Sequence, residues 1–146
     1  MTDRFYPTEL TCFCLVESQG QLLIMQKNDS EFAPSMTFPG GHVEPDEALT
    51  AAATRELAEE CGLTVTTWRL ASVVNFKRGD GRKELIFVFA GTLPAPKNTQ
   101  HRAGTKDEGQ TRWVPIADFA SLALNGVVRA VYDAYRSGQV KELFFN

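Results

Sequence analysis

Hydrophobic and polar positions alternate along much of the chain, in short segments that end at turn-forming residues. Such segments are typical of β-strands, because successive side chains of a strand point to opposite faces of its sheet. Polar runs at Lys77–Arg82 and Ser18–Gly20 predict a hairpin loop and a turn. The pattern predicts six strands, at Leu10–Val16, Leu22–Gln26, Thr64–Trp68, Leu70–Lys77, Lys83–Thr92 and Thr111–Val114.

A different pattern predicts the helices. Between Asp46 and Cys61 no Gly or Pro interrupts a run rich in Ala, Leu and Glu, which are strong helix formers. Gly62 suits the left-handed residue that ends many helices, so we expect a helix of about four turns. Further helices are predicted briefly near Ile116–Ala120 and over Gly126–Ser137.

The central predicted helix carries its acidic residues in an unusual place. Apolar residues recur at four-residue steps from Leu49 to Leu57 and form a narrow stripe. Glu56, Glu59 and Glu60 share one face beside that stripe, near the end of the helix where the macrodipole disfavours negative charge. A bound cation would reverse this penalty, so the pattern favours chemistry over a merely solvated charged helix.

Strands on either side of this helix, followed by a C-terminal helix, predict an α/β layered fold. The chain has 146 residues and 43% hydrophobic content, which suits a single domain over residues 1–146. Leu93–Gly109 shows no periodicity and is predicted to be a long connection, of a length that is often functional.

Composition and charge narrow the functional classes. The sequence shows no signal segment, no long apolar run and no lipidation motif, so we expect a cytoplasmic protein without a membrane partner. A net charge of −3 argues against a long nucleic acid as partner. Cys12, Cys14 and Cys61 match neither a disulfide framework nor a zinc site, so reduced, partly buried thiols are expected.

The segment from Gly41 to Leu63 resembles the Nudix box, G-x5-E-x7-R-E-U-x-E-E-x-G-U, where U is a bulky aliphatic residue. Every fixed position is matched, over 23 of the 146 residues. The resemblance implies the Nudix α/β/α sandwich, with a mixed β-sheet between helices. It also implies a hydrolase that cleaves a phosphoric anhydride in a small nucleotide substrate.

The box positions carry the implied metal site. In the family they imply Glu56, Glu59 and Glu60 as ligands of Mg²⁺, with the carbonyl of Gly40 as a further ligand. Mn²⁺ should substitute, because the donors are all oxygen atoms. Arg55 and Glu47 are implied to pair, which fixes the helix and orients the acids.

The general base has two candidates, Glu56 and Glu108. Glu108 lies just before the predicted strand Thr111–Val114. That stretch resembles the one where many Nudix enzymes supply an extra catalytic or metal-binding glutamate. The alternative is an ordinary acidic loop residue, and the sequence leaves both open.

The segment that follows the box matches none of the additional signals of ADP-ribose, dinucleoside polyphosphate or NADH hydrolases, and the signature that precedes the box in coenzyme A hydrolases is also missing. A nucleoside triphosphate or another nucleoside diphosphate derivative is therefore favoured. The Glu108 segment and Asn125 resemble 8-oxo-dGTP diphosphatases, in which an Asn side chain can bind the purine edge; a helix-capping role for Asn125 is the alternative. Phe76 is a candidate for stacking on the base, and Lys27 and Arg78 are candidates for phosphate contacts.

Alternative functions remain at this point. One is a hydrolase of ADP-ribose or dinucleoside polyphosphates, and another is a non-catalytic Nudix module that senses a nucleotide. The complete box favours an enzyme. Leu143–Phe145 and Leu10–Val16 could form a homodimer surface or belong to the core.

Overall fold

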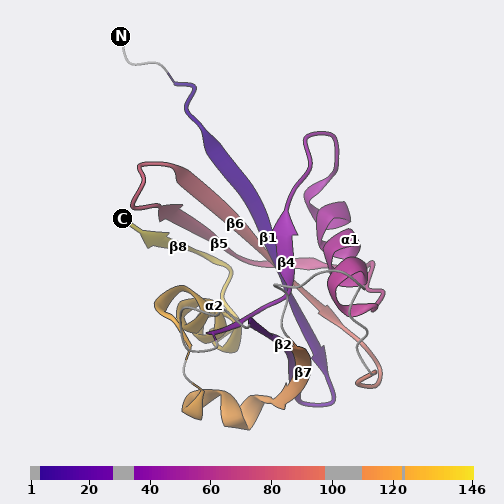
Figure 1. The fold of residues 1–146 in the computed structure, drawn as a ribbon. Coiled ribbons are helices and arrows are strands. Elements are labelled where there is room, and N and C mark those ends of the chain that lie inside the picture. Colours follow the sequence, from indigo (N-terminus) through magenta and orange to yellow (C-terminus); the bar gives the residue numbers. More distant parts are fainter. Residues whose placement is uncertain (1–3, 28–34, 98–109, 123) are drawn as a thin grey trace.

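The computed structural model describes residues 4–27, 35–97, 110–122 and 124–146. In this part of the chain eight strands form one mixed sheet. The strands are β1 (Thr8–Ser18), β2 (Gln21–Lys27), β3 (Ser35–Thr37), β4 (Gly40–His42), β5 (Arg69–Lys77), β6 (Lys83–Thr92), β7 (Gln110–Pro115) and β8 (Lys141–Phe145). The helices are α1 (Leu49–Cys61), the 3₁₀ helix η1 (Ile116–Ser121) and α2 (Gly126–Ser137), as Figure 1 shows.

Strand β1 is the centre of the sheet. The order is β3-β2-β1-β6-β5-β8, with β4 also paired to β1 and β7 to β2. One edge of β1 runs parallel to β6 from Thr8 to Glu17. Its other edge is shared, because β4 pairs with Thr11–Phe13 whereas β2 pairs only with the last residues of the strand. Gly41, which begins the box segment, and the preceding Gly40 are thereby joined to the middle of the sheet.

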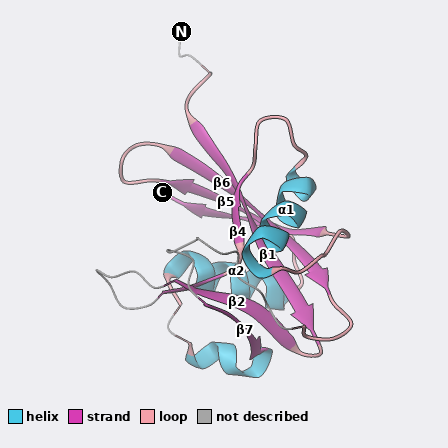
Figure 2. Cartoon of the chain, turned by 45° about the vertical axis from the view of Figure 1, so that its right-hand side comes forward, coloured by secondary structure: helices cyan, strands magenta, loops and turns pink. Residues whose placement is uncertain are grey.

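Two hydrophobic cores lie on opposite faces of this sheet. Cys12 and Cys14 of β1 belong to the core under α1, together with Leu57. Leu15 belongs to the core under α2, together with Val131. Because neighbouring side chains of a strand point to opposite faces, this division of β1 places the two helices on opposite sides of the sheet. Figure 2 shows α1 beside β1 and β4 from a second direction. The predicted α/β sandwich with a mixed sheet is confirmed.

Five of the six predicted strands are present, at β1, β2, β5, β6 and β7. The prediction at Thr64–Trp68 is wrong, because that segment is a loop without a ladder partner. Its alternating pattern reflects Leu63 and Val65, which are buried under α1 without being in a strand. The short strands β3, β4 and β8 were not predicted, since three residues in β3 and β4 give too little periodicity to detect, and Lys141–Phe145 in β8 does not alternate strictly between polar and apolar residues.

The helix predictions hold, with one shift. α2 spans Gly126–Ser137 as predicted, and Gly62 has the expected left-handed conformation with φ 69°. α1 begins at Leu49 instead of following Asp46 directly. The preceding segment is a turn, in which the Glu47 carboxylate accepts a hydrogen bond from the Glu44 backbone N–H at 2.9 Å.

The C-terminal strand β8 lies at the edge of the sheet, parallel to β5. Leu143 and Phe145 pack on the core under α2, so this part of the C-terminal run is core. Phe144 points the other way and is 63% exposed. None of the described helices is long and apolar enough to cross a membrane.

Candidate active site

The site begins where two glycines of β4 meet β1 and α1. A Cβ on Gly40 would overlap the carbonyl oxygen of Cys12 in β1. A Cβ on Gly41 would lie 2.5 Å from the carboxyl carbon of Glu56. Only glycine at these positions lets the strand, the central sheet and the helix approach so closely. The consequence is that the Glu56 carboxylate lies directly against the backbone of β4.

Arg55 and Glu47 form the predicted pair. Arg55 Nη2 donates to Glu47 Oε1 at 2.6 Å and Nε donates to Oε2 at 3.1 Å, which is a bidentate contact. These bonds, with the backbone N–H of Glu44, lower the pKa of the Glu47 carboxyl to about 2. The same contact raises the pKa of Arg55, so both groups are charged at neutral pH.

Arg55 also joins the helix to β4. Its Nη2 donates to the backbone carbonyl of His42 at 3.0 Å. Its Nη1 contacts Glu56 Oε1 at 3.0 Å and Glu59 Oε2 at 3.4 Å. One guanidinium therefore orients two of the acidic residues of α1 and holds them beside the β4 strand.

The three acids of α1 differ in burial. Glu60 is only 6% exposed, whereas the side chains of Glu56 and Glu59 are 14% and 39% exposed. Glu60 lies near Cys14, and its charge contributes to raising the pKa of that thiol. Buried carboxylates are costly unless they are paired or bind a cation, so their placement at the edge of the core supports a functional role.

The donor set suits a hard divalent cation, since carboxylates and a backbone carbonyl are the oxygen ligands that Mg²⁺ prefers. Within the described ranges, however, no three His, Cys, Asp or Glu side chains converge closely enough to hold a metal ion. The physical reason is visible at Arg55, which draws Glu56 and Glu59 toward its own guanidinium. A metal at this site would compete with Arg55 for the oxygen atoms of these two carboxylates.

Beneath the site lie three buried thiols, Cys12, Cys14 and Cys61. Their burial is more complete than predicted, and their reduced state stays a prediction. The hydrogen bond with Cys12 and burial raise the pKa of Cys14 well above its usual value. Cys14 Sγ also donates to the carbonyl of Ala53 in α1 at 3.5 Å. These thiols act as small apolar side chains that allow α1 to pack closely on β1.

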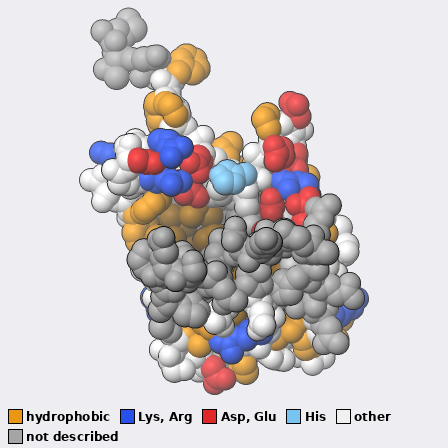
Figure 3. Space-filling view, viewed as in Figure 1, with side chains coloured by type: hydrophobic (Ala, Val, Ile, Leu, Met, Phe, Trp, Pro, Cys, Tyr) orange, Lys and Arg blue, Asp and Glu red, His pale blue; other side chains and the backbone are white. Residues whose placement is uncertain are grey.

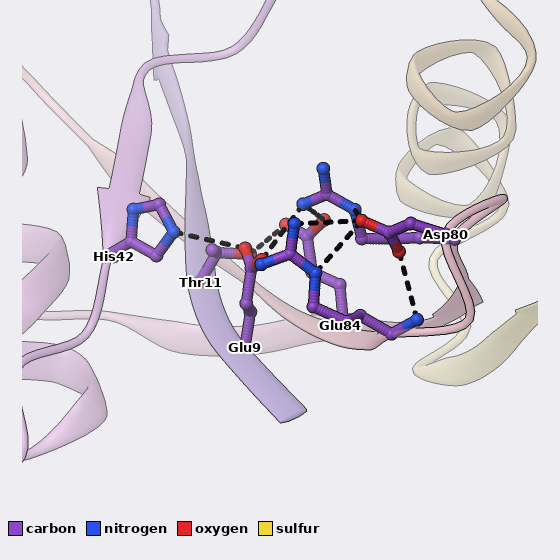
Figure 4. Close-up of polar contacts among 7 residues, drawn as sticks. Glu9, Thr11, His42, Asp80 and Glu84 are labelled. Carbon is purple, nitrogen blue, oxygen red and sulfur yellow. Dashed lines mark hydrogen bonds and ion pairs between the residues drawn. The ribbon is translucent and has the colours of Figure 1, made fainter. Parts of the chain in front are cut away.

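A second polar cluster lies on the opposite face of β1 (Figure 4). Glu9 contacts His42 Nε2 at 3.2 Å and accepts from Arg78 Nη1 at 3.1 Å. Glu84 accepts from the Thr11 hydroxyl at 2.8 Å. The cluster connects the β5–β6 hairpin to β1 and, through His42, to the strand whose carbonyl Arg55 holds.

On the face seen in Figure 3, charged side chains gather in two groups. One group mixes basic and acidic side chains at the hairpin between β5 and β6, and the other is mainly acidic and lies over α1 and the turn before it. Between the groups lies β4. The two groups therefore flank this strand.

The remaining predicted site residues have varied surroundings. Asn125 Oδ1 accepts from the Val128 N–H at 2.8 Å, so the capping role is observed, and contact with a purine stays a prediction. Phe76 packs edge-on against Phe145 at the margin of the core, with ring centroids 6.3 Å apart. Arg78 is ion-paired with Glu9.

Two residues predicted to belong to the site, Glu108 and Lys27, cannot be placed in it. Glu108 lies outside the described residues. Lys27 ends β2, and its side chain is likewise outside the described part of the chain. The roles proposed for both stay predictions.

Sequence reasoning missed His42 and Glu9. His42 occupies an unspecified position of the box motif, and its contribution to the Arg55 contact is a backbone carbonyl. Glu9 stands in a strand far away in the sequence and meets His42 only because β4 pairs with β1. The periodicity of the sequence carries no signal for either contact.

Comparison with known proteins places these features in a family context. The NUDIX domain profile matches residues 6–135. The phosphatase NudJ of Escherichia coli K12 is 29% identical over 136 residues, covering 92% of this chain and 87% of NudJ. The MutT protein of Methanosarcina mazei Go1 matches with a TM-score of 0.75 at 23% identity, covering 90% of this chain and 94% of that protein. The NUDIX domain of Shewanella oneidensis NrtR, solved with ADP-ribose, also matches with a TM-score of 0.75, at 18% identity and with 93% and 92% of the two chains covered.

Proposed function

The chain belongs to the NUDIX family and is a hydrolase of phosphoric anhydrides, and we propose that it cleaves a nucleoside triphosphate or another nucleoside diphosphate derivative with the help of Mg²⁺. The observation that carries the proposed hydrolytic site is the set of contacts that Arg55 makes. A single guanidinium bridges Glu47, Glu56, Glu59 and the carbonyl of His42, and so fixes the acids of α1 beside β4.

We assign Glu56, Glu59 and Glu60, with the Gly40 carbonyl, as the residues that would hold the metal. When bound, a divalent cation neutralises phosphate charge and lowers the pKa of a coordinated water. Arg55 and Glu47 orient the acids, and Glu108 is proposed as a further ligand or as the general base in place of Glu56. Mn²⁺ is expected to substitute for Mg²⁺ because it accepts the same oxygen donors.

The protein's contribution to hydrolysis is positioning and charge compensation. A polyanionic substrate approaches acids poorly unless cations offset the repulsion, and attack by water requires an aligned nucleophile. Glu56 is fixed by Arg55 on one side and by the β4 backbone on the other, so its carboxylate is held in one place. This fixed carboxylate is suited to accept a proton from an attacking water.

For the substrate we favour an oxidised deoxynucleoside triphosphate such as 8-oxo-dGTP. The support is the sequence resemblance at the Glu108 segment and Asn125, since the box alone does not select a base. The ADP-ribose bound by the NrtR domain and the phosphatase activity named for NudJ make ADP-ribose and smaller phosphorylated nucleotides the compounds to compare with it.

The test is a Mg²⁺-dependent screen for release of phosphate or pyrophosphate from dGTP, 8-oxo-dGTP, other nucleoside triphosphates, ADP-ribose and dinucleoside polyphosphates. We expect turnover of at least one triphosphate, with 8-oxo-dGTP preferred by kcat/KM, and loss of turnover in excess EDTA. Binding of a nucleotide without turnover of any compound would instead support a nucleotide-sensing module.

We also propose that residues 1–146 form a single domain that acts in the cytoplasm without a long nucleic acid or membrane partner. A homodimer is proposed through the exposed ring of Phe144 on the edge strand β8. Sedimentation of the protein and of a Phe144→Ser variant tests this point, and a monomer at all concentrations would refute it.

A further inference from the structure

A cavity of about 420 Å³ lies away from the box, where β6 ends and β5 begins. It is open to solvent and is bordered by the loop after α1, the carboxyl end of β6 and Tyr135 of α2. β4 pairs with β1 at Thr11–Phe13, whereas the cavity borders the end of β6 that pairs with Leu15–Glu17 of β1. The cavity is thus separate from the acids that Arg55 gathers. Its polar and aromatic lining includes Thr66, Thr67, Trp68, Arg69, Thr92 and Tyr135.

Arg69 contributes a positive charge to the lining of the cavity. Within the described residues Arg69 forms no ion pair, in contrast to Arg55 and Arg78, which each contact carboxylates. Its guanidinium carbon lies 5.6 Å from the centroid of the Tyr135 ring, which holds the side chain at the cavity wall. The Tyr135 hydroxyl is itself engaged, because it donates to Glu17 Oε1 at 2.9 Å. An anionic group would therefore meet a positioned cation.

Threonines share the cavity lining with Arg69. Thr66, Thr67 and Thr92 are exposed and line the cavity. A threonine hydroxyl both donates and accepts a hydrogen bond, so it can bind a sugar hydroxyl in either orientation. One cation beside several hydroxyls suits a ligand that carries a single anionic group and several hydroxyl groups.

The wall formed by the loop after α1 is rigidly built. A Cβ on Gly91 would lie 2.7 Å from Val65 Cγ1 and 3.1 Å from the Trp68 ring, so glycine allows the loop to pack on β6. Trp68 Nε1 donates to the Thr54 hydroxyl at 2.9 Å, and this hydroxyl donates to the Val65 carbonyl at 2.8 Å. Preformed walls reduce the entropy cost of binding a small ligand.

We propose that this cavity is a second ligand site, which binds a phosphorylated sugar or a nucleoside monophosphate with the phosphate at Arg69 and the hydroxyls at the threonines. Thr54, which bonds to the cavity wall, immediately precedes Arg55 in α1. A ligand at this site is therefore placed to influence the box helix from outside the box.

The test uses the indole N–H signals of the protein in ¹H–¹⁵N NMR spectra, assigned with a Trp113→Phe variant. Trp68 Nε1 reports on the cavity, while Trp113 Nε1 donates to the Lys97 carbonyl and serves as an internal reference. Ribose 5-phosphate and AMP should shift the Trp68 signal, and inorganic phosphate or ribose alone should bind about tenfold more weakly or worse.

Variants separate this site from the box. Arg69→Gln should abolish the Trp68 shift, whereas the matched Arg112→Gln, which removes an exposed arginine of β7, should preserve it. An unchanged Trp68 signal at about 10 mM of both ligands, or a shift that survives Arg69→Gln, would overturn the proposal. Binding is measured without turnover, so its failure is independent of the catalytic proposal.

Discussion

The two long helices of the molecule are built by different rules. α2 is preceded by the N-cap residue Asn125, whose side chain accepts from the Val128 N–H, and it carries Arg136 in its last turn. α1 is preceded by Ala48, which offers no side-chain cap, and it has no acid in its first turn and no base in its last. Both end at a left-handed glycine, Gly62 or Gly138. Only the helix that carries the box acids departs from the rules of local stability.

The difference shows what holds each helix. α2 combines a satisfied cap, a favourable charge at its C-terminus and a buried apolar face. α1 depends on the burial of residues such as Ala53 and Leu57 and on the contacts of Arg55 to β4. A helix that lacks the usual caps and end charges, and is stabilised by tertiary contacts instead, is typical of a functional site. This contrast identifies α1 as the functional helix.

The largest expected effect comes from the acids of α1. Glu56→Gln should lower kcat about 100- to 1000-fold, because a fixed charged group at the reacting centre is lost, while thermal unfolding changes little. Steady-state kinetics and calorimetry measure both quantities. Asp133→Asn, which neutralises an exposed acid of α2, is the control. Equal losses in the two variants would remove the functional distinction between the helices.

Glu47→Gln is expected to lower kcat about 10- to 100-fold by releasing Arg55 from its bidentate contact, which steady-state kinetics measures.

The same variant tests the pH dependence of stability. Since folding lowers the pKa of Glu47 from 4.5 to about 2, its contact with Arg55 stabilises the protein above pH 4.5, and this stabilisation is lost as the pH falls toward 2. Denaturation at several pH values should show a weaker acid dependence in the variant. The exposed Glu44→Gln variant should behave as wild type, and an unchanged acid limb in Glu47→Gln would contradict the assignment.

Asn125→Ala should destabilise the protein by about 1 kcal/mol, because α2 loses its cap. Asn125→Ser keeps a capping hydroxyl and should restore most of this stability in urea denaturation. The serine variant also separates the two roles of Asn125. A rise in KM for purine substrates with intact stability would support contact with the base, and an unchanged KM would leave only the cap.

The smallest expected effect is a gain in the free energy of unfolding. Ala48 has the extended conformation of a capping residue, with φ −65° and ψ 149°, so Ala48→Ser should stabilise α1 by about 0.5–1 kcal/mol. Ala51→Ser, within the same helix, should instead destabilise slightly, because serine is a poorer helix former than alanine. If both substitutions had the same sign in urea denaturation, the missing cap would not be a weakness of α1.

Local structure was largely predictable from the sequence. Helix formers between two turn signals predicted α1 and α2, and the end of each at Gly62 or Gly138 follows from the conformational freedom of glycine. The spacing of Glu56, Glu59 and Glu60 placed them on one face, because helical geometry depends only on neighbouring residues. The pairing of Arg55 with Glu47 was implied by the family motif and is present.

The tertiary structure decided the contacts between segments that are distant in the sequence. Parallel pairing of β1 with β6 and the addition of β4 to β1 depend on which apolar faces are buried together. Those pairings bring Gly41 against Glu56, Glu9 to His42, and Trp68 to Thr54. Local periodicity determined where most helices and strands form and which face of α1 carries its acids. The simultaneous burial of both sheet faces determined which segments lie side by side, because packing energy depends on the whole fold.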